Sequence, residues 1–512
     1  MIGLVSSAKI FLRDPQLFSN LVIRFPLYNY QLVPLKAIIK SILFKQGHEF
    51  LLIFPRQSGK NETIAQLLVY LLNLFQRTGG QIVYGATGDG IGRGLSRLEE
   101  RLDNDWNKKN WEKKNKPTRR VLGNAAVAFL STHPGAATRG ETAHILLAID
   151  EFQDQSLNHI ESVFEPMRAA FNTTAVFFGT AKTTSDALWQ KKQQLEMLEK
   201  DGTKRVFLVS PEEVIEENLD YGAFLKAKLA KFGRNHPIIS SEYFNEPIDA
   251  DGGLFSNRRL QLMFGQHNRE EKPNSGRNYV ASIDIGGQDE GATDPVAQLD
   301  SPGRDYTVAT VFEISKPLGA SMPHYKAVDV FLDHGSHHFT PAAGRPSLAA
   351  QLLAWLQHWN VSYVVIDSTG IGAGLTDWLR PYFNDRVTGY LFTKRSKAQL
   401  GSSFISVIET GRFHYWQSEK LFDDSWWFRV QAENCSYYLP PNGVFDHDLQ
   451  WAVPPSARVD AGAGRKPIHD DRLLSAALVS YFDILYNKGV LFLGEAVSQI
   501  VAPIDPLSDL SW

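Results

Sequence analysis

The sequence predicts an α/β protein with two domains, and three observations support this prediction. In the first half, short apolar runs alternate with amphipathic segments, which is typical of a parallel sheet covered by helices. Residues 249–278 are polar and contain Gly and Pro, so we expect a domain boundary there. The second half begins with two or three strands in succession and then alternates helix and strand, which favours a mixed α/β sheet over an all-β fold.

The first domain is expected to span residues 1–250. Helices are predicted at Glu62–Gln76 and Ser185–Lys200. Tyr221–Phe244 is also predicted to be helical, and residues 211–250 are expected to form a lid or bridging element. Buried apolar runs predict strands at Glu49–Phe54, Gln81–Gly85, Ala125–Leu130, His144–Ile149, Ala175–Gly179 and Val206–Val209.

Residues 251–278 are expected to form a linker, residues 279–488 a second domain, and residues 489–512 a mobile or partner-docking tail. In the second domain, strands are predicted at Tyr279–Ile283, Tyr306–Ile314, His324–Leu332, Tyr363–Ile366 and Val387–Phe392. Helices are predicted at Ser347–Trp359, Lys397–Glu409 and Asp471–Leu485.

The composition indicates a globular intracellular protein. Of the 512 residues, 43% are apolar and 12% are aromatic, which is enough for more than one core. The single cysteine, Cys435, excludes an internal disulfide framework and indicates a reducing compartment. Charged residues interrupt the N-terminal apolar residues, and no apolar run approaches the ~20 residues that span a bilayer. We therefore expect a soluble protein without a secretory signal.

The net charge of −3 does not indicate nucleic-acid binding by itself, so a contact with DNA would have to come from local patches. The densest basic patch has tryptophans among its cations, which suits a nucleic-acid strand. A solvated helix face is the alternative interpretation. The patch consists of Trp106, Lys108, Lys109, Trp111, Lys113, Lys114, Lys116, Arg119 and Arg120.

The predicted strand Glu49–Phe54 leads into the loop Pro55–Lys60, and an apolar helix follows. Strand, loop and helix in this order are the context of a phosphate-binding loop. Gly59 allows the backbone to approach a phosphate closely, and Lys60 can neutralise the β- and γ-phosphates of a nucleotide. Because turns before helices are often built in this way, the loop requires a second observation.

That second observation is an acidic pair at the end of the predicted strand His144–Ile149. Asp150 is a candidate for holding Mg²⁺ through water, and Glu151 for orienting or deprotonating the attacking water. Taken alone, the pair has a solvated strand end as its alternative interpretation. Together with Lys60, it predicts an ATP site.

Carboxylates also end elements of the second half. Asp284 and Asp367 follow predicted strands, and Asp470 and Asp471 open a predicted helix, where free N–H groups tolerate acids. Such carboxylates can converge on two divalent ions ~3.5–4 Å apart that cleave a phosphodiester, and oxygen ligands favour Mg²⁺ or Mn²⁺ over zinc. Taken singly, Asp284 can precede a glycine turn, and Asp470 or Asp471 can be a helix cap.

Three cations precede the predicted helix Lys397–Glu409. Lys394, Arg395 and Lys397 either contact a DNA phosphate or are ordinary solvated charges beside a helix.

The loop residues Arg56, Gln57, Ser58, Gly59 and Lys60 resemble the phosphate loop of the large subunits of viral DNA-packaging terminases, the motors of tailed bacteriophages. This resemblance gives roles to residues elsewhere in the first half.

An Arg-Gly pair precedes the acidic strand in this family, as Arg139-Gly140 does here. The resemblance implies that Arg139 is an arginine finger acting on the ATP of a neighbouring subunit, with a surface arginine as the alternative. It also implies that Phe177–Ala181 is the motif that couples hydrolysis to DNA movement. Gln31 is similar to the family's adenine-reading glutamine.

One position departs from the family pattern. Asn61 follows the loop lysine, where phosphate-loop proteins generally have Ser or Thr as a Mg²⁺ ligand. Either the Asn61 amide oxygen accepts a metal-bound water, or Ser58 compensates. The departure bears on the strength of ATP turnover more than on ATP binding.

The carboxylates of the second half resemble the RNase H-like nuclease of the same family. By this resemblance, Asp284 and Asp367 are its strand aspartates, and Asp470-Asp471 lies at its acidic helix start. Asp305 is similar to an accessory acid on the second strand, after a longer hairpin than usual. The implied architecture is a P-loop ATPase of the ASCE type with a parallel sheet, followed by an RNase H-like nuclease with a mixed sheet.

The resemblance also implies a function, which is ATP-driven translocation of double-stranded DNA into a viral procapsid and metal-dependent endonucleolytic cutting of concatemeric DNA. The implied cofactors are ATP and Mg²⁺, or Mn²⁺ at the nuclease site. The implied partners are double-stranded DNA, the portal protein, the small terminase subunit and further copies in a ring, with no membrane. The implied location is the host cytoplasm, transiently at the procapsid portal vertex. Competing interpretations are a helicase, a defence-type ATPase-nuclease, or a DNA-binding structural remnant with one dead site.

Overall fold

The computed structural model describes residues 11–115, 118–136, 138, 140–286, 306–333, 338–341, 346–462 and 464–491. The chain divides into two compact units, Met1–Ala250 with Pro440–Asn442, and Asp251–Leu439 with Gly443–Trp512. Each unit has its own sheet. Across these described ranges, no helix combines the length and apolar character that a bilayer crossing needs.

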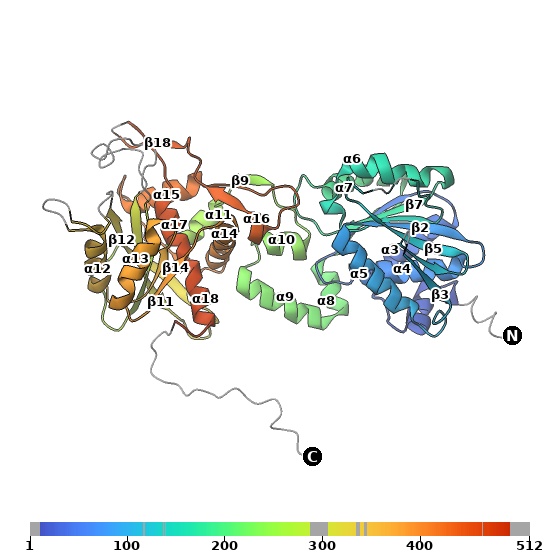
Figure 1. Ribbon diagram of the computed structural model, residues 1–512, viewed down its shortest axis with the longest axis horizontal. Helices are drawn as coiled ribbons and strands as arrows, with labels where there is room; N and C mark the ends of the chain where they lie inside the picture. Colours follow the sequence, from blue (N-terminus) through green and yellow to red (C-terminus); the bar gives the residue numbers. More distant parts are fainter. Residues whose placement is uncertain are drawn as a thin grey trace, which may run out of the picture. The chain divides into compact units, whose positions relative to one another are not determined.

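The first unit contains a sheet with the strand order β3-β4-β5-β2-β6-β7-β1-β8 (Figure 1). From β5 to β8 the strands are parallel, which confirms the predicted parallel sheet. The strand before the phosphate loop, β1, and the strand before the acidic pair, β6, are separated by β7. This additional strand between them is the arrangement of the ASCE type. The parallel strands are β1 (Glu49–Ile53), β2 (Gly80–Ala86), β5 (Ala125–Ser131), β6 (Leu146–Ile149), β7 (Thr174–Gly179) and β8 (Val206–Leu208).

Helices cover both faces of this sheet. Phe50 and Leu52 of β1 lie in one core with α3 (Asn29–Leu43) and α4 (Lys60–Phe75). Leu51 and Ile53 lie in the opposite core with α7 (Ala187–Leu198). Burial on both faces explains why the strand is a continuous apolar run instead of an alternating one.

The predicted helix Tyr221–Phe244 is two helices, α9 (Leu219–Phe232) and α10 (Pro237–Phe244), preceded by α8 (Pro211–Glu217). Gly233 ends α9 with a φ of 82°, which favours glycine, and Pro237 opens α10, where its missing N–H is tolerated. Tyr221 and Tyr243 are buried in the core shared with α3 and α4. The region expected to be a lid therefore packs into the first unit.

The second unit contains a six-stranded sheet with the order β14-β13-β10-β11-β12-β15. β10, β11 and β12 are successive antiparallel neighbours, whereas β13 lies parallel on the other side of β10 and β14 parallel to β13. This is the RNase H-like order and confirms the mixed sheet. The strands are β10 (Asn278–Asp284), β11 (Thr307–Ser315), β12 (His324–Asp333), β13 (Val361–Asp367), β14 (Val387–Tyr390) and β15 (Phe413–His414).

The two faces of this sheet have different covers. Ile283 and Ile366 lie in the core formed with α12 (Leu348–His358) and α13 (Ile371–Leu379). The opposite face of β10 and β11 contacts α17 (Asp471–Ala477), which itself contacts α14 (Lys394–Glu409). The predicted helix Asp471–Leu485 is broken by the 3-10 turn Leu478–Ser480, and α18 (Tyr481–Asn487) follows.

The segment 251–278 is not a linker. It contains β9 (Asp251–Gly253), which pairs with β16 (Ser436–Tyr438), and α11 (Asn257–Met263). Arg269 donates to the Asp329 carboxylate at 2.7 Å. Backbone pairing and this ion pair make the segment part of the second unit, although its polar composition resembles that of a linker.

Candidate functional site

Side-chain hydroxyls bind the backbone carbonyls of the phosphate loop in the first unit. The Ser58 hydroxyl donates to the Pro55 carbonyl at 2.7 Å, and the Tyr30 hydroxyl donates to the Ser58 carbonyl at 2.8 Å. Gln57 and Gly59 have positive φ values of 64° and 91°, and α4 begins directly after Gly59. No described side chain caps this helix end, so its first N–H groups face the position where a phosphate would bind.

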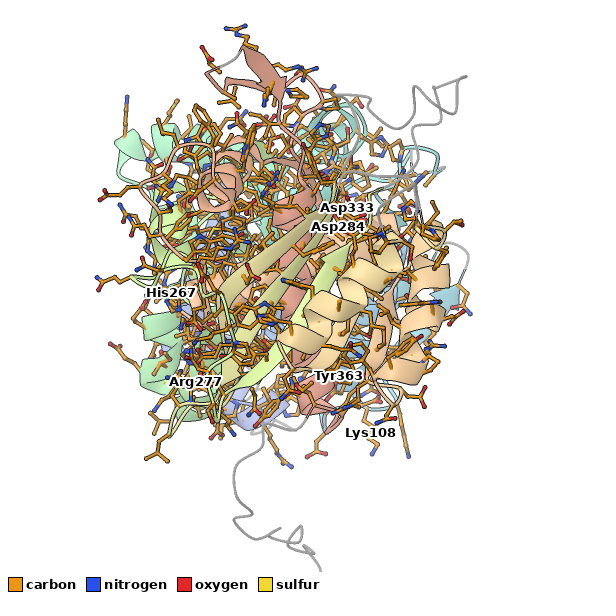
Figure 2. All side chains as sticks on the ribbon, turned by 90° about the vertical axis from the view of Figure 1, so that its left-hand side faces the viewer. Lys108, His267, Arg277, Asp284, Asp333 and Tyr363 are labelled. Carbon is orange, nitrogen blue, oxygen red and sulfur yellow. The ribbon has the colours of Figure 1, made fainter. Side chains whose placement is uncertain are left out.

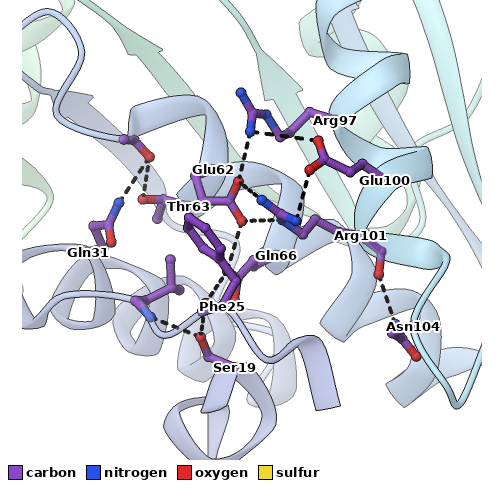
Figure 3. Close-up of polar contacts among 12 residues, drawn as sticks. Ser19, Phe25, Gln31, Glu62, Thr63, Gln66, Arg97, Glu100, Arg101 and Asn104 are labelled. Atoms are coloured by element: carbon purple, nitrogen blue, oxygen red, sulfur yellow. Dashed lines mark hydrogen bonds and ion pairs between the residues drawn. The ribbon is translucent and has the colours of Figure 1, made fainter. Parts of the chain in front are cut away.

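Gln31 supports the loop from α3 (Figure 3). Its amide nitrogen donates to the Gly59 carbonyl at 3.1 Å, and its amide oxygen accepts from the Tyr28 N–H at 2.9 Å. A Cβ at Gly59 would lie 2.3 Å from the Gln31 amide nitrogen, so the close approach requires glycine. Because Gln31 is buried and both of its polar atoms are bonded, adenine reading by Gln31 would first require these bonds to break; that role stays a prediction.

The acidic pair lies beside the loop lysine. Glu151 is ion-paired with Lys60, with Nζ and Oε2 3.2 Å apart. Asp150 is 1% exposed, and its carboxylate accepts from the Tyr84 hydroxyl at 2.8 Å and from the Glu151 N–H at 2.8 Å. A solvated strand end is therefore excluded for Asp150. Asp150 is buried and Glu151 half-buried at the end of a core strand, and such acids are tolerated only beside a cation or a proton.

The two carboxyls respond differently to this environment. Burial opposes the charged form of Glu151, but Lys60 and the Gln153 amide outweigh burial, so the pKa of Glu151 is lowered. Burial, with Glu151 adding its charge, raises the pKa of Asp150 although Lys60 acts in the opposite direction. Asp150 is thus the carboxyl that gains most from an added cation.

Asn61 has an unusual environment for a polar side chain. Its amide oxygen is buried and has no hydrogen-bond partner among the described residues. The Ser58 hydroxyl is committed to Pro55, and the Thr63 hydroxyl donates to the Gly59 carbonyl at 3.1 Å. An unpaired buried oxygen costs ~1–3 kcal/mol, and a cation or its water would satisfy it. Of the two compensations expected for the missing Ser or Thr, the contacts favour Asn61 over Ser58.

Other predicted residues of this site lie around the loop or outside the described residues. Arg56 is ion-paired with Glu242 at 2.6 Å, so its guanidinium is held toward α10. Arg139 lies outside the described residues. Phe177–Ala181 covers the end of β7 and the loop after it, and β7 lies between β1 and β6. The proposed coupling motif is therefore adjacent to both strands that carry the ATP site.

In the second unit, two predicted carboxylates end neighbouring parallel strands. β10 and β13 are paired up to Ile283 and Ile366, so Asp284 and Asp367 are the next residues of two strands in register. Parallel neighbours are ~4.8 Å apart and in-register side chains share a face. Both aspartates are 7% exposed. Figure 2 shows Asp284 near the end of the sheet, where Asp333 also ends its strand.

A serine clamp brings the third carboxylate to this edge. The Ser282 hydroxyl donates to the Ser475 carbonyl at 2.5 Å, and the Ser475 hydroxyl donates to the Ser282 carbonyl at 3.1 Å. Asp471 is one helical turn before Ser475, a rise of ~6 Å, and Asp284 is two strand residues after Ser282, a rise of ~6.6 Å. Asp471 and Asp284 therefore lie at similar distances from the clamp along their own elements.

The charges in this cluster have little internal compensation. Burial, followed by Asp471, Asp367 and Asp470, raises the pKa of Asp284 well above its ordinary value, and Lys397 acts in the opposite direction. Burial also raises the pKa of Asp367, whose carboxylate accepts from the Thr369 N–H at 2.8 Å. An acid cluster that resists ionisation suits a divalent cation with oxygen ligands.

The geometry of a complete metal site is not present among the described residues, where no group of three or more His, Cys, Asp or Glu side chains is arranged to hold a metal ion. Asp471 accepts from the Tyr306 N–H at 3.0 Å. Asp470 makes no side-chain cap bond within the described chain and lies 3.7 Å from the Lys397 ammonium, so the helix-cap interpretation of Asp470 is not supported. Asp305 lies outside the described residues.

The basic patch of the first unit is partly neutralised. Trp111, Lys113, Lys114, Arg119 and Arg120 of this patch lie on the hairpin of β3 (Trp111–Asn115) and β4 (Thr118–Leu122), which pairs with β5 and is not a helix face. Trp106, Lys108 and Lys109 lie in the turn before it, and Lys116 lies outside the described residues. Lys113 and Arg120 are both ion-paired with Glu99, and Arg119 with Glu141. Carboxylates therefore neutralise part of the positive charge that the sequence shows in this patch. Its exposed lysines include Lys108, Lys109 and Lys114.

Several contributing residues are absent from the predictions. Tyr84 binds Asp150, Gln153 binds Glu151, and Ser282 and Ser475 position Asp471. A polar side chain in a buried element is expected to have a hydrogen-bond partner, but the sequence does not say which one. These residues could therefore not be assigned to a site from the sequence.

The strand orders give the chain a phosphate-loop fold in the first unit and an RNase H-like fold in the second. No protein-family model and no curated protein matches this sequence. Among solved structures, the chain is similar to the large terminase of a thermophilic bacteriophage, at 10% identity and a TM-score of 0.43, over 90% of this chain and 99% of that one.

Two other solved structures are of the same kind. The large terminase of bacteriophage HK97 matches at 13% identity and a TM-score of 0.39, over 92% of this chain and 99% of that one. The magnesium-bound large terminase nuclease of another thermophilic phage, G20c, matches at 17% identity and a TM-score of 0.31, over 44% of this chain and 96% of that one. These are structures from the family that the motifs resemble. At such identities and scores the likeness assigns no role to any residue of this chain.

Proposed function

We propose that this chain is a terminase large subunit, which moves double-stranded DNA into a procapsid with ATP and cuts concatemeric DNA with a metal-dependent nuclease. The observation that carries this proposal is the occurrence of two separate acid sites in one chain. One is paired with the phosphate-loop lysine, Lys60–Glu151, and the other lies at the edge of an RNase H-like sheet.

In the ATP reaction, Lys60 and the N–H groups that open α4 bind the phosphates. Water attacks the γ-phosphorus, the bond to the β,γ-bridging oxygen breaks, and ADP and phosphate result. When Lys60 turns to the phosphates, it leaves Glu151, and the cause that lowers the pKa of Glu151 is weakened. The carboxylate thereby becomes a better acceptor for the proton of the attacking water. Mg²⁺ neutralises phosphate charge, and Asp150 and Asn61 are the residues proposed to hold it.

In the nuclease reaction, a divalent ion supplies activation of water and stabilisation of the leaving oxygen. Asp284, Asp367 and Asp471 are proposed to hold it, with Asp470 and Asp305 as further candidates. Lys397 lies within reach of Asp470 and is proposed to offset charge at the cluster. The serine clamp is proposed to hold Asp471 of α17 close to Asp284 and Asp367 at the ends of their strands.

The proposed partners are double-stranded DNA, the portal protein, the small terminase subunit and further copies of the chain. The proposed location is the host cytoplasm and, during packaging, the portal vertex. Arg139 is proposed to act on a neighbouring copy's ATP.

The test compares cleavage of supercoiled plasmid and ATP hydrolysis by the full chain in Mg²⁺ or Mn²⁺. Asp367→Ala should abolish cleavage and leave ATP turnover intact. Lys60→Ala should do the reverse, because the two sites belong to different units.

Four outcomes would contradict parts of the proposal. The assigned nuclease activity would be wrong if the folded native chain never cut DNA with either metal. It would also be wrong if the Asp367→Ala variant cut DNA normally. ATP turnover that survives Lys60→Ala would remove the assigned ATP site. Duplex unwinding without portal binding would favour a helicase instead.

A further inference from the structure

We propose that Gln153 is a positioning residue for ATP hydrolysis. Gln153 holds the Glu151 carboxylate and links it to the loop after β7. That loop in turn connects to the last residues before Ala250. This inference rests on the proposed hydrolysis of ATP at Glu151.

Gln153 uses both ends of its amide. Its nitrogen donates to the Glu151 carboxylate at 2.7 Å, and its oxygen accepts from the Thr180 N–H at 3.2 Å. The side chain is 5% exposed, so solvent does not readily replace either bond. A shift of Glu151 toward a water molecule must therefore stretch the bond to Gln153 or move Thr180 with it.

The backbone is shaped for this contact. Glu151 has a φ of 44°, an uncommon value for a non-glycine residue, and the 3-10 turn Phe152–Asp154 follows it. At Gly179, a Cβ would lie 2.0 Å from the Gln153 amide oxygen and 2.5 Å from a methyl group of Leu188. Glycine at residue 179 thus leaves the space through which Gln153 reaches Thr180.

Two neighbours of Gln153 make parallel contacts with the same strand and loop. The rings of Phe152 and Phe177 are 4.6 Å apart, and the Lys182 ammonium donates to the Asp154 carboxylate at 2.6 Å. Three successive residues of the turn therefore bind three successive parts of the β7 region. The turn and the loop should move as one body.

The loop after β7 is bonded to the last residues of the first unit. The Ile248 N–H donates to the Lys182 carbonyl at 3.0 Å, and the Thr184 N–H donates to the Ile248 carbonyl at 2.9 Å. The Thr184 hydroxyl donates to the Asp249 carboxylate at 3.1 Å. The first unit ends at Ala250, so a displacement that begins at Glu151 reaches the point where the chain passes to the second unit.

The first experiment measures nucleotide affinity and ATP turnover in Gln153→Met, which keeps side-chain length but removes both bonds. We expect kcat to fall about tenfold or more while nucleotide Kd changes less than about threefold, because the lost bonds position the carboxylate and do not touch the phosphates. The control is Gln190→Met, because Gln190 is exposed and, among the described residues, its amide binds the Ser185 carbonyl alone.

The second experiment tests the contact at Gly179. Gly179→Ala alone should lower kcat as Gln153→Met does, because the new Cβ displaces the amide. In a Gln153→Ala background the same change should cost much less, since only the Leu188 contact remains. Independent sites would instead give multiplied losses.

The third experiment follows amide hydrogen exchange of the segment that contains Ile248, with and without a non-hydrolysable ATP analogue. The analogue should change exchange there in the native chain, and Gln153→Met should abolish the change. Thr184→Val should weaken the response, whereas Thr183→Val should not, because the Thr183 hydroxyl contacts only Ser185 among described residues.

The inference is overturned if Gln153→Met turns over ATP like the native chain, or if the analogue leaves exchange at Ile248 unchanged. Failure of the proposed function looks different, since the native chain would then neither bind nor hydrolyse ATP.

Discussion

Replacing Ser475 by alanine tests whether the serine clamp positions the third carboxylate of the nuclease site. Ser475 is fully buried, and its hydroxyl makes two hydrogen bonds, one to the Ser282 carbonyl and one with the Thr310 hydroxyl at 2.9 Å. Each bond is worth ~1 kcal/mol net, and stranding the buried Thr310 hydroxyl costs ~1–3 kcal/mol. We expect Ser475→Ala to lower the free energy of unfolding by about 3–5 kcal/mol, which is the sum of the two lost bonds and the stranded hydroxyl.

The same change should impair cleavage beyond its effect on stability. Asp471 lies one turn from the clamp, and a displacement of ~1 Å in a catalytic group can cost ~10²-fold in rate. We expect plasmid cleavage per folded molecule to fall between about tenfold and a hundredfold at saturating Mn²⁺. The unfolding transition of the second unit and the rate of nicking are the two measurements.

Two matched variants separate stability from positioning. Ser480→Ala removes a buried hydroxyl that bonds only to the Ala477 carbonyl at 2.9 Å, so it should cost about 1 kcal/mol and leave cleavage unchanged. Thr310→Val added to Ser475→Ala removes the stranded hydroxyl and should restore about 1–2 kcal/mol. Native-like cleavage by Ser475→Ala, or a double variant no more stable than the single one, would refute the reasoning.

Three further predictions concern the charged and polar groups around the two sites. In the absence of Mg²⁺, Asn61→Leu should bind nucleotide with the same affinity as the native chain. Mg²⁺ should then raise the nucleotide affinity of the native chain and of Asn61→Ser, but not that of Asn61→Leu. Titrations with a fluorescent nucleotide, with and without the metal, measure these affinities. Asp284→Asn should stabilise the metal-free chain by about 1 kcal/mol at neutral pH, as relieving strain at a functional site commonly does. The sign follows from the raised pKa of Asp284: its contribution to stability is present at low pH and lost as pH rises through the folded-state pKa, so unfolding curves of the native chain should respond to pH and to added Mg²⁺ more strongly than those of Asp284→Asn. Arg101→Met should lower the free energy of unfolding by about 3 kcal/mol, because Glu62 is then left buried without its main partner (Figure 3). Adding Glu62→Leu to Arg101→Met should restore most of this stability, as measured by urea unfolding. A double variant as unstable as Arg101→Met would contradict the explanation.

Strands that end in an acid were the most predictable part of the molecule. A continuous apolar run followed by Asp150, Asp284 or Asp367 is visible in sequence, because both faces of a central strand are apolar and an acid directly after the run marks its end. The sheet order then brings these ends together. Fold class and the placement of these carboxylates therefore followed from local patterns.

Other elements carry no such pattern. β3 is mostly exposed and charged, and β4 is partly buried with two successive arginines, so neither strand has an apolar run. α5 (Gly88–Leu102) has glycine at residues 88, 90, 92 and 94, each of which disfavours a helix by ~1 kcal/mol. Its packing explains one of them, since a Cβ at Gly94 would lie 3.0 Å from the Tyr84 ring. Tertiary contacts decide such segments.

Side-chain partners across distant segments were also beyond sequence reasoning. Arg119, Arg120 and Lys113 look like a free basic patch in sequence, yet Glu99 and Glu141 neutralise them from other elements. Gln31 likewise matches an adenine-reading glutamine, but in the structure its amide supports the phosphate loop. Partner choice depends on register and packing, which the local sequence does not contain.

The two acid sites differ in the source of their positive charge. In the first unit, the Lys60 ammonium lies against Glu151, so one carboxyl ionises easily before any ligand binds. In the second unit, Lys397 is ion-paired with Asp470, and although Lys397 also acts to lower the pKa of Asp284, that pKa remains well above its ordinary value. The ATP site can thus keep its charged geometry without a cation, whereas the carboxylates of the second site repel one another until a cation binds. Removing divalent ions should consequently loosen the acid edge of the second unit while leaving the Lys60–Glu151 pair in place.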